Sequence, residues 1–222
     1  MKRIFTFLIL GCLVSITSFA TDRWGIYIAG TLSHDCGGYF DYNADGNTNF
    51  KWGGGALLGC GYEIGFANAW SITPALEFSY TDNGAYYNKT GKPAVNPFAT
   101  DSKAQSVSHI WTSSWNIAIP VTAGYRIALS NNVRLRINAG VYFSEALAVR
   151  HFVNTGNSQN PVYEKRKVSS DFGNDFQIGT VGSFSVETAP HFSYFFRTQY
   201  PFLKDRWSTS TVTLALGVGY SF

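Results

Sequence analysis

The stretch WSITPALEFSYT, residues 70–81, alternates large apolar side chains with small or polar ones without interruption. Its bulky face carries Trp70, Ile72, Pro74, Leu76, Phe78 and Tyr80. The opposite face carries Ser71, Thr73, Ala75, Glu77, Ser79 and Thr81. A period of two is the period of a β-strand whose two faces meet different surroundings. The stretch therefore predicts a strand of about a dozen residues.

The same alternation continues along the rest of the chain. Residues 132–144 and 211–222 repeat it cleanly, and five further segments follow it less perfectly: 23–33, 50–64, 107–127, 174–187 and 191–200. Beyond the first twenty residues there is no apolar run long enough for a spanning helix. Eight strands of about ten or more residues are what a small closed membrane barrel requires. We therefore predict an all-β fold, an eight-stranded antiparallel up-and-down transmembrane β-barrel.

The small-residue face favours a barrel over a soluble β-sandwich. The polar face of a sandwich meets water and normally carries Lys, Glu and Arg. Here that face is rich in small residues, namely Gly53, Gly55, Gly59, Gly61, Ala215, Gly217, Gly219 and Ser221. Small residues suit the narrow interior of an eight-stranded barrel. The alternative, in which the bulky face fills a soluble core, stays open at this point.

Aromatic residues on the bulky face form two bands. One band comprises Trp24, Tyr62, Trp70, Tyr125 and Tyr220, and the other comprises Trp52, Tyr80, Trp111, Phe176 and Tyr200. Two aromatic bands are typical of the two interfaces of a bilayer. The bands therefore favour a barrel surrounded by lipid.

The connections between the segments alternate in length. Long ones cover 34–49, 82–106 and 148–173, with a shorter one at 201–206, whereas 65–69, 128–132 and 187–190 are short. In outer-membrane barrels the long loops face outward and the tight turns face the periplasm. We therefore expect both termini in the periplasm.

The first twenty residues have the features of a secretory signal peptide. Lys2 and Arg3 precede an apolar run over residues 4–16, and Ser18-Phe19-Ala20 is a small-x-small cleavage pattern. We predict a signal peptide at 1–20 and a barrel domain at 21–222, with a lipidated Cys12 as a weaker alternative. Cleavage would remove two positive charges from the net +3, leaving +1. A nearly neutral chain gives no electrostatic case for binding nucleic acid.

Several motifs resemble those of known outer-membrane barrels. The terminal Phe222 resembles the signal by which the barrel-assembly machinery recognises its clients, which implies that machinery as a partner. The stretches WNIAIPVTAGYR (115–126), RINAGVYFS (136–144) and NDFQIGTVGSFSVE (174–187) resemble the PorT-like outer-membrane β-barrel domain family. The steps that carry the likeness are Ile119-Pro120 and Ala139-Gly140. The resemblance implies a barrel in the outer membrane of a Gram-negative cell, and one branch of that family serves protein secretion.

Charged residues on the small-residue face predict a polar network inside the barrel. Its members would be Glu63, Arg126, Arg134, Arg136 and Glu187 near the periplasmic end, and Glu77, Asp175 and Arg197 further up. Opposite charges inside a low-dielectric shell must pair, and we expect Asp175 to meet Arg197. We expect a static plug, with a gate that exchanges ion-pair partners as the alternative. Pro120 lacks a backbone donor, which predicts a bulge or a ladder break.

The sequence offers one weak metal site and two cysteines in the mature chain. Asp41, Asn43 and Asp45, followed by Gly46, resemble the start of a calcium loop, but its twelfth position is Trp52 instead of the bidentate Glu. We expect no other metal and no cofactor. Cys36 and Cys60 would lie too far apart for a disulfide, so both are predicted to be free thiols, with Cys60 facing lipid.

The function predicted from these features is not enzymatic. A barrel with a filled interior would sit in outer-membrane lipid and present long outer loops to a protein or surface ligand. A component of a secretion or envelope-assembly complex is the first alternative. A lipid-modifying enzyme is the second, with His109 and Ser113 on the outward face, although no carboxylate is evident to orient that histidine.

Overall fold

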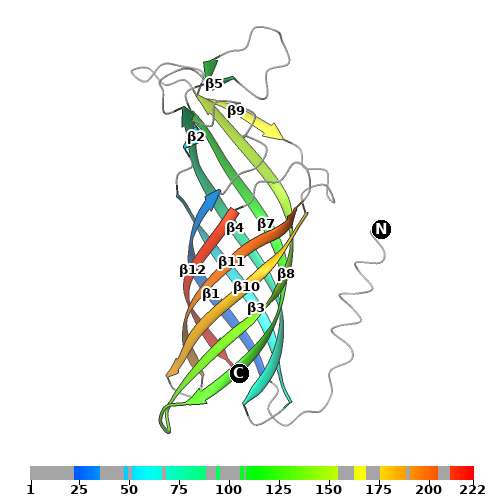
Figure 1. Ribbon diagram of the computed structural model, residues 1–222, viewed down its shortest axis with the longest axis vertical. Coiled ribbons are helices and arrows are strands. Elements are labelled where there is room, and N and C mark those ends of the chain that lie inside the picture. The colour runs from blue at the N-terminus through cyan, green and yellow to red at the C-terminus, as the bar shows by residue number, and fades with distance from the viewer. Residues whose placement is uncertain are drawn as a thin grey trace, which may run out of the picture.

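Eight long antiparallel strands close into a barrel in the computed structural model (Figure 1). The structure describes residues 23–35, 48–49, 52–66, 69–88, 94–95, 106–107, 109–154, 163–168, 176–188, 191–204 and 211–222. The barrel strands are β1 (Arg23–Asp35), β3 (Gly53–Gly65), β4 (Trp70–Asn88), β7 (His109–Ala128), β8 (Val133–Asn154), β10 (Phe176–Thr188), β11 (Phe192–Lys204) and β12 (Thr211–Ser221).

Each strand pairs with the strands before and after it in the chain. The order runs β1-β3-β4-β7-β8-β10-β11-β12, and β12 pairs with β1 to close the sheet. The predicted fold class is therefore confirmed, and each of the eight predicted segments overlaps one barrel strand. Closure pairs the backbone hydrogen-bonding groups of β1 and β12, which would be unpaired edge strands in an open sheet.

One end of the barrel carries all three short turns, and we call it the turn end. The backbone nitrogen of Phe66 donates to the Trp70 carbonyl at 3.2 Å, and that of Leu129 donates to the Val133 carbonyl at 3.0 Å. Phe222 at the C-terminus lies at this end too, because its nitrogen donates to the Trp24 carbonyl at 2.9 Å. The opposite end is called the loop end.

Three neighbouring strands are much longer than the other five. β4, β7 and β8 have 19, 20 and 22 residues, whereas the others have 11 to 13. Figure 1 shows them projecting past the rest of the barrel at the loop end. Short strands accompany them there: β2 (Thr48–Asn49) pairs with β4, β9 (Tyr163–Val168) pairs with β8, and β5 (Ala94–Val95) pairs with β6 (Ser106–Val107).

The long strands correct two of the predicted loop boundaries. Residues 82–106 and 148–173 were expected to be loops, but β4 continues to Asn88 and β8 continues to Asn154. These extensions are stable as strands because β4 pairs with β7, and β7 with β8, beyond the rim. The sequence did not reveal them because neither extension separates apolar from polar residues by face, and a strand outside the membrane needs no apolar face.

The burial pattern is the inverse of that of a soluble domain. Large apolar side chains face outward: Leu216 is 70% exposed and Ile28 is 56% exposed. Among the described residues, the buried hydrophobic side chains are only Ala29, Leu57, Ala118, Tyr142, Val181 and Ala215. A soluble β-sandwich would bury its bulky face. The alternative of a soluble β-sandwich is therefore excluded. In the described ranges no helix is long and apolar enough to cross a membrane.

The outward aromatic residues form a band near each end. At the turn end the Trp24 and Tyr62 rings lie 4.8 Å apart, and those of Trp70 and Tyr125 lie 4.9 Å apart. Towards the loop end, the rings of Tyr80 and Trp115 lie 4.9 Å apart. Ten residues separate Trp70 from Tyr80, which on a strand tilted by about 40° spans about 25 Å. That distance matches the apolar band of an outer-membrane barrel. The side chain of Trp111 lies outside the described set.

Pro120 interrupts the pairing of β7 with β4 without shifting its register. Between β4 and β7, Pro74 pairs with Val121 and the next pair is Glu77 with Ala118. The two positions between these pairs are unpaired, and the register is the same on both sides of the gap. On the other side, Pro120 pairs with Tyr142 of β8. The predicted ladder break is thus present and the predicted bulge is not, because proline removes only one donor.

Candidate functional site

The inward face of the barrel carries two layers of charged side chains. Alternation along each strand directs small and charged residues inward, so the charges must be satisfied by one another. The turn-end layer is built on Glu63 of β3, and the second layer is built on Glu77 of β4.

Three guanidinium groups surround the carboxylate of Glu63. Arg23 Nε lies 2.8 Å from Oε2, Arg126 Nη2 lies 2.5 Å from Oε1, and Arg136 Nη1 lies 3.1 Å from Oε2. Glu187 of β10 shares two of these cations, at 2.7 Å from Arg23 Nη2 and 3.6 Å from Arg126 Nε. The five residues come from five strands, so the cluster ties together most of the barrel's circumference at the turn end.

The second layer is an ion pair that crosses the barrel. Arg197 of β11 donates from Nη2 to Glu77 Oε2 at 3.0 Å, and Nη1 also bonds the other carboxylate oxygen. The Tyr27 hydroxyl donates to Glu77 Oε1, the oxygen that Arg197 Nη1 also contacts. Glu77 is 2% exposed and Arg197 is 7% exposed. A two-point contact between guanidinium and carboxylate fixes orientation as well as charge.

The structure brings together most of the predicted network and changes its pairings. Glu63, Arg126, Arg136 and Glu187 form one cluster, but Arg134 is exposed at the rim and is not seen in it. Arg197 pairs with Glu77, and Asp175 lies outside the described residues. Sequence reasoning missed Arg23 and Tyr27. The alternation in segment 23–33 does indicate both residues. Each lies an even number of positions from Ala29, which faces inward, so each faces inward too.

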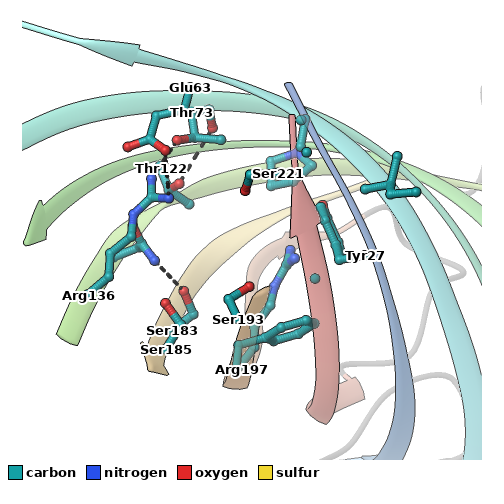
Figure 2. Close-up of a pocket in the computed structure, with 18 of the residues that line it drawn as sticks. Tyr27, Glu63, Thr73, Thr122, Arg136, Ser183, Ser185, Ser193, Arg197 and Ser221 are labelled. Atoms are coloured by element: carbon teal, nitrogen blue, oxygen red, sulfur yellow. Dashed lines mark hydrogen bonds and ion pairs between the residues drawn. The ribbon is translucent and has the colours of Figure 1, made fainter. Parts of the chain in front are cut away.

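A cavity of about 150 Å³ lies between the two charged layers. Arg136, Glu63 and Arg23 line it on the turn-end side, and Tyr27 and Arg197 line it on the other. Its walls carry hydroxyl groups from Thr73, Thr122, Ser183, Ser185, Ser193 and Ser221. Figure 2 shows Arg136 and Arg197 reaching into this space from β8 and β11, with Ser183 and Ser193 between them in this view.

Three inward rings pack against glycines and narrow the bore. A Cβ atom on Gly59 would lie 2.3 Å from Tyr27 Cζ, and one on Gly179 would lie 2.4 Å from Tyr142 Cε1. A Cβ atom on Gly217 would lie 2.5 Å from Phe195 Cζ. The rings of Tyr27 and Phe195 also contact each other edge to face, with centroids 5.8 Å apart. Glycine at these positions therefore leaves the space that the three aromatic rings occupy inside the barrel.

The other candidate residues lie apart from this network. No group of three potential metal ligands occurs in the described ranges, and the calcium candidates Asp41, Asn43 and Asp45 lie outside them. Cys60 is a free, exposed cysteine as predicted, whereas Cys36 is not described. Ser113 was expected on the outward face but is only 7% exposed, and the His109 side chain is not described.

A closed barrel with a filled polar interior and an apolar exterior of membrane thickness defines the class as a transmembrane β-barrel. Residues 23–204 match the outer membrane protein beta-barrel domain family, and the chain belongs to that family. That family places it in the outer membrane of a Gram-negative cell, as the sequence predicted. The narrower PorT-like assignment stays a prediction.

Solved structures of other barrels resemble this chain at low identity. Ail, the attachment invasion locus protein of Yersinia pestis, is 17% identical over 90% of this chain and 98% of its own, with a TM-score of 0.45. OprG from Pseudomonas aeruginosa is 11% identical over 91% and 96%, also with a TM-score of 0.45. The outer membrane enzyme PagL is 11% identical over 88% and 98%, with a TM-score of 0.38. No curated protein matches. At these identities and TM-scores the likenesses carry no inference about function.

Proposed function

We propose that this chain is a non-enzymatic barrel that anchors a binding platform at its loop end, where it contacts a protein or surface ligand. The observation that carries the proposal is the unequal length of the strands. A tilted strand needs about 9–11 residues to cross the membrane. β7 and β8, with 20 and 22 residues, extend about twice that far, and β4 accompanies them. Paired strands held rigidly beyond the bilayer form a surface on which loops can be displayed.

The filled interior supports an anchoring role over a pore. Tyr27, Tyr142 and Phe195 occupy the bore at the glycine positions, and the pair of Glu77 and Arg197 crosses it. An eight-stranded barrel has an interior that side chains fill. Purified protein in planar lipid bilayers should therefore give no large, steady conductance steps, with protein-free bilayers as the control. Steady large steps would contradict a filled interior.

The display role can be tested by shortening the platform while leaving the barrel whole. In one variant a short turn replaces residues 148–168, which removes the end of β8 from Ala148 onward and all of β9. Folding is checked by the shift in gel mobility on heating that intact barrels show. Cells carrying the native or shortened chain are crosslinked, and the proteins bound to the barrel are compared. The proposal predicts loss of partners in the shortened chain, and unchanged partners would contradict it.

A role in a secretion or envelope-assembly complex is the second candidate, and the resemblance of residues 115–126 to the PorT-like family favours it. An assembly component should bring the same proteins in fixed ratios from every preparation. A surface-binding barrel should bring partners that depend on the loop end. The same crosslinking experiment distinguishes the two, because partners of an assembly component that dock on the barrel wall or the turn end survive the loop-end deletion.

A further inference from the structure

The cavity inside the barrel lies in a region with an excess of positive charge. From the turn end up to the level of Glu77, the described inward side chains include four guanidinium groups and three carboxylates: Arg23, Arg126, Arg136, Arg197, Glu63, Glu77 and Glu187. Arg197 and Glu77 balance each other. The turn-end cluster therefore holds three cations against the carboxylates of Glu63 and Glu187.

Arg136 is the cation with the least compensation. It shares Glu63 with Arg23 and Arg126, and its Nη2 donates to neutral oxygens, Ser71 Oγ at 3.2 Å and Thr73 Oγ1 at 2.8 Å. Its Nε has no hydrogen-bond acceptor, and the buried Nε of Arg197 has none either. Both arginines line the cavity. A buried charge without a counter-charge costs several kcal/mol, so this arrangement favours a negative ion nearby.

The walls of the cavity suit such an ion. Hydroxyl groups of Ser183, Ser185, Ser193 and Ser221 can each donate a hydrogen bond to it. The volume of about 150 Å³ is well above the roughly 10–15 Å³ that one water molecule needs on the same measure. The space therefore has room for a small ion together with several waters. A cation is disfavoured by the excess positive charge.

We propose that the barrel interior binds a small monovalent inorganic anion, of the size of chloride, in the cavity between Arg136 and Arg197. The anion supplies the counter-charge that the turn-end cluster lacks and joins the two charged layers through the serine hydroxyls. A ligand that binds only the folded state stabilises that state. The site therefore links the stability of the barrel to the anions present.

The test compares urea unfolding of the refolded protein in sodium chloride and in sodium gluconate at equal ionic strength. Gluconate is a much larger anion than chloride, so chloride should raise the unfolding midpoint of the native protein above its value in gluconate. Arg136→Gln removes the excess cation while Glu63 keeps Arg23 and Arg126, and the chloride effect should disappear. Arg134→Gln, two residues away on the exposed rim, removes the same charge and should keep the chloride effect.

Asn138→Asp provides a second variant in case Arg136→Gln does not fold. Asn138 lines the cavity and its Oδ1 has no hydrogen-bond donor. A carboxylate there would supply the missing negative charge within the chain, so this variant should also lose its response to chloride. Equal midpoints in chloride and gluconate for the native protein would overturn the proposal. So would a chloride response that persists unchanged in Asn138→Asp.

A direct measurement uses bromide, which replaces chloride and scatters anomalously. Crystals grown from detergent and soaked in sodium bromide should show an anomalous peak between Arg136 and Arg197, and crystals of Asn138→Asp should not. Water alone in the native cavity after soaking would overturn the proposal.

Discussion

The ring of Tyr27 covers Gly59 on the neighbouring strand so closely that a methyl group there would lie 2.3 Å from Tyr27 Cζ. The hydroxyl of the same ring bonds Glu77, which in turn holds Arg197. The absence of a side chain at Gly59 thus allows the Tyr27 hydroxyl to reach the central ion pair of the barrel.

Replacing Gly59 with alanine should destabilise the barrel. The added methyl group would push Tyr27 off Glu77, and overpacking of this kind typically costs about 1–3 kcal/mol. The free energy of unfolding in urea, measured in lipid vesicles, checks this. The matched control is Gly54→Ala on the same strand, where an added Cβ meets nothing within 4 Å. A loss in Gly54→Ala as large as that in Gly59→Ala would contradict the explanation.

Removing the charge of Glu77 should be one of the most damaging single changes. Glu77→Gln leaves the Arg197 guanidinium buried without a carboxylate, at a cost of about 3–5 kcal/mol. The double variant Glu77→Gln with Arg197→Met removes both charges and should recover much of that loss. Unfolding free energies of the native, single and double variants form the cycle that measures the coupling. Additive losses would show that the two residues do not depend on each other.

The two aromatic bands should lie at the two membrane interfaces. With the other tryptophans replaced by phenylalanine, Trp70 should be quenched most by lipids brominated near the headgroup. In a chain with all native tryptophans replaced, Leu76→Trp should be quenched most by lipids brominated deep in the acyl chain, because Leu76 faces outward between the bands. Tryptophan fluorescence in vesicles measures both depths. Equal depths would contradict the placement of the bilayer.

Cys60 should be reachable from lipid and protected from water. It is free and exposed, and its strand partners Ile26 and Leu76 are outward apolar residues. In a chain of residues 21–222 carrying Cys36→Ser, placed in vesicles, a lipid-soluble maleimide should modify Cys60, whereas a charged maleimide should not. Mass spectrometry gives the extent of reaction, and the urea-unfolded chain, which should react with both, is the control. Rapid reaction of the folded chain with the charged reagent would place Cys60 in water.

Within the membrane-spanning part of the barrel, the sequence was sufficient to predict the strands and which side chains face lipid. Along residues 70–81 the alternation is a local property of the chain, because successive side chains of a strand point to opposite faces. Leu76 and Phe78 are outward and Glu77 is inward, as that pattern predicts. The same rule placed Cys60 outward. It did not find the extensions of β4 and β8, where polar and apolar residues are mixed on both faces and the alternation carries no signal.

The partners of the inward charges were decided by the tertiary structure. Sequence order places Asp175 and Arg197 on adjacent strands, and that nearness suggested a pair. In the barrel Arg197 reaches Glu77, whose strand is separated from β11 by three strands in either direction around the wall. Strand tilt and closure determine which inward residues share a level across the bore. Alternation fixes the face of a side chain, but only the closed barrel fixes what that side chain meets.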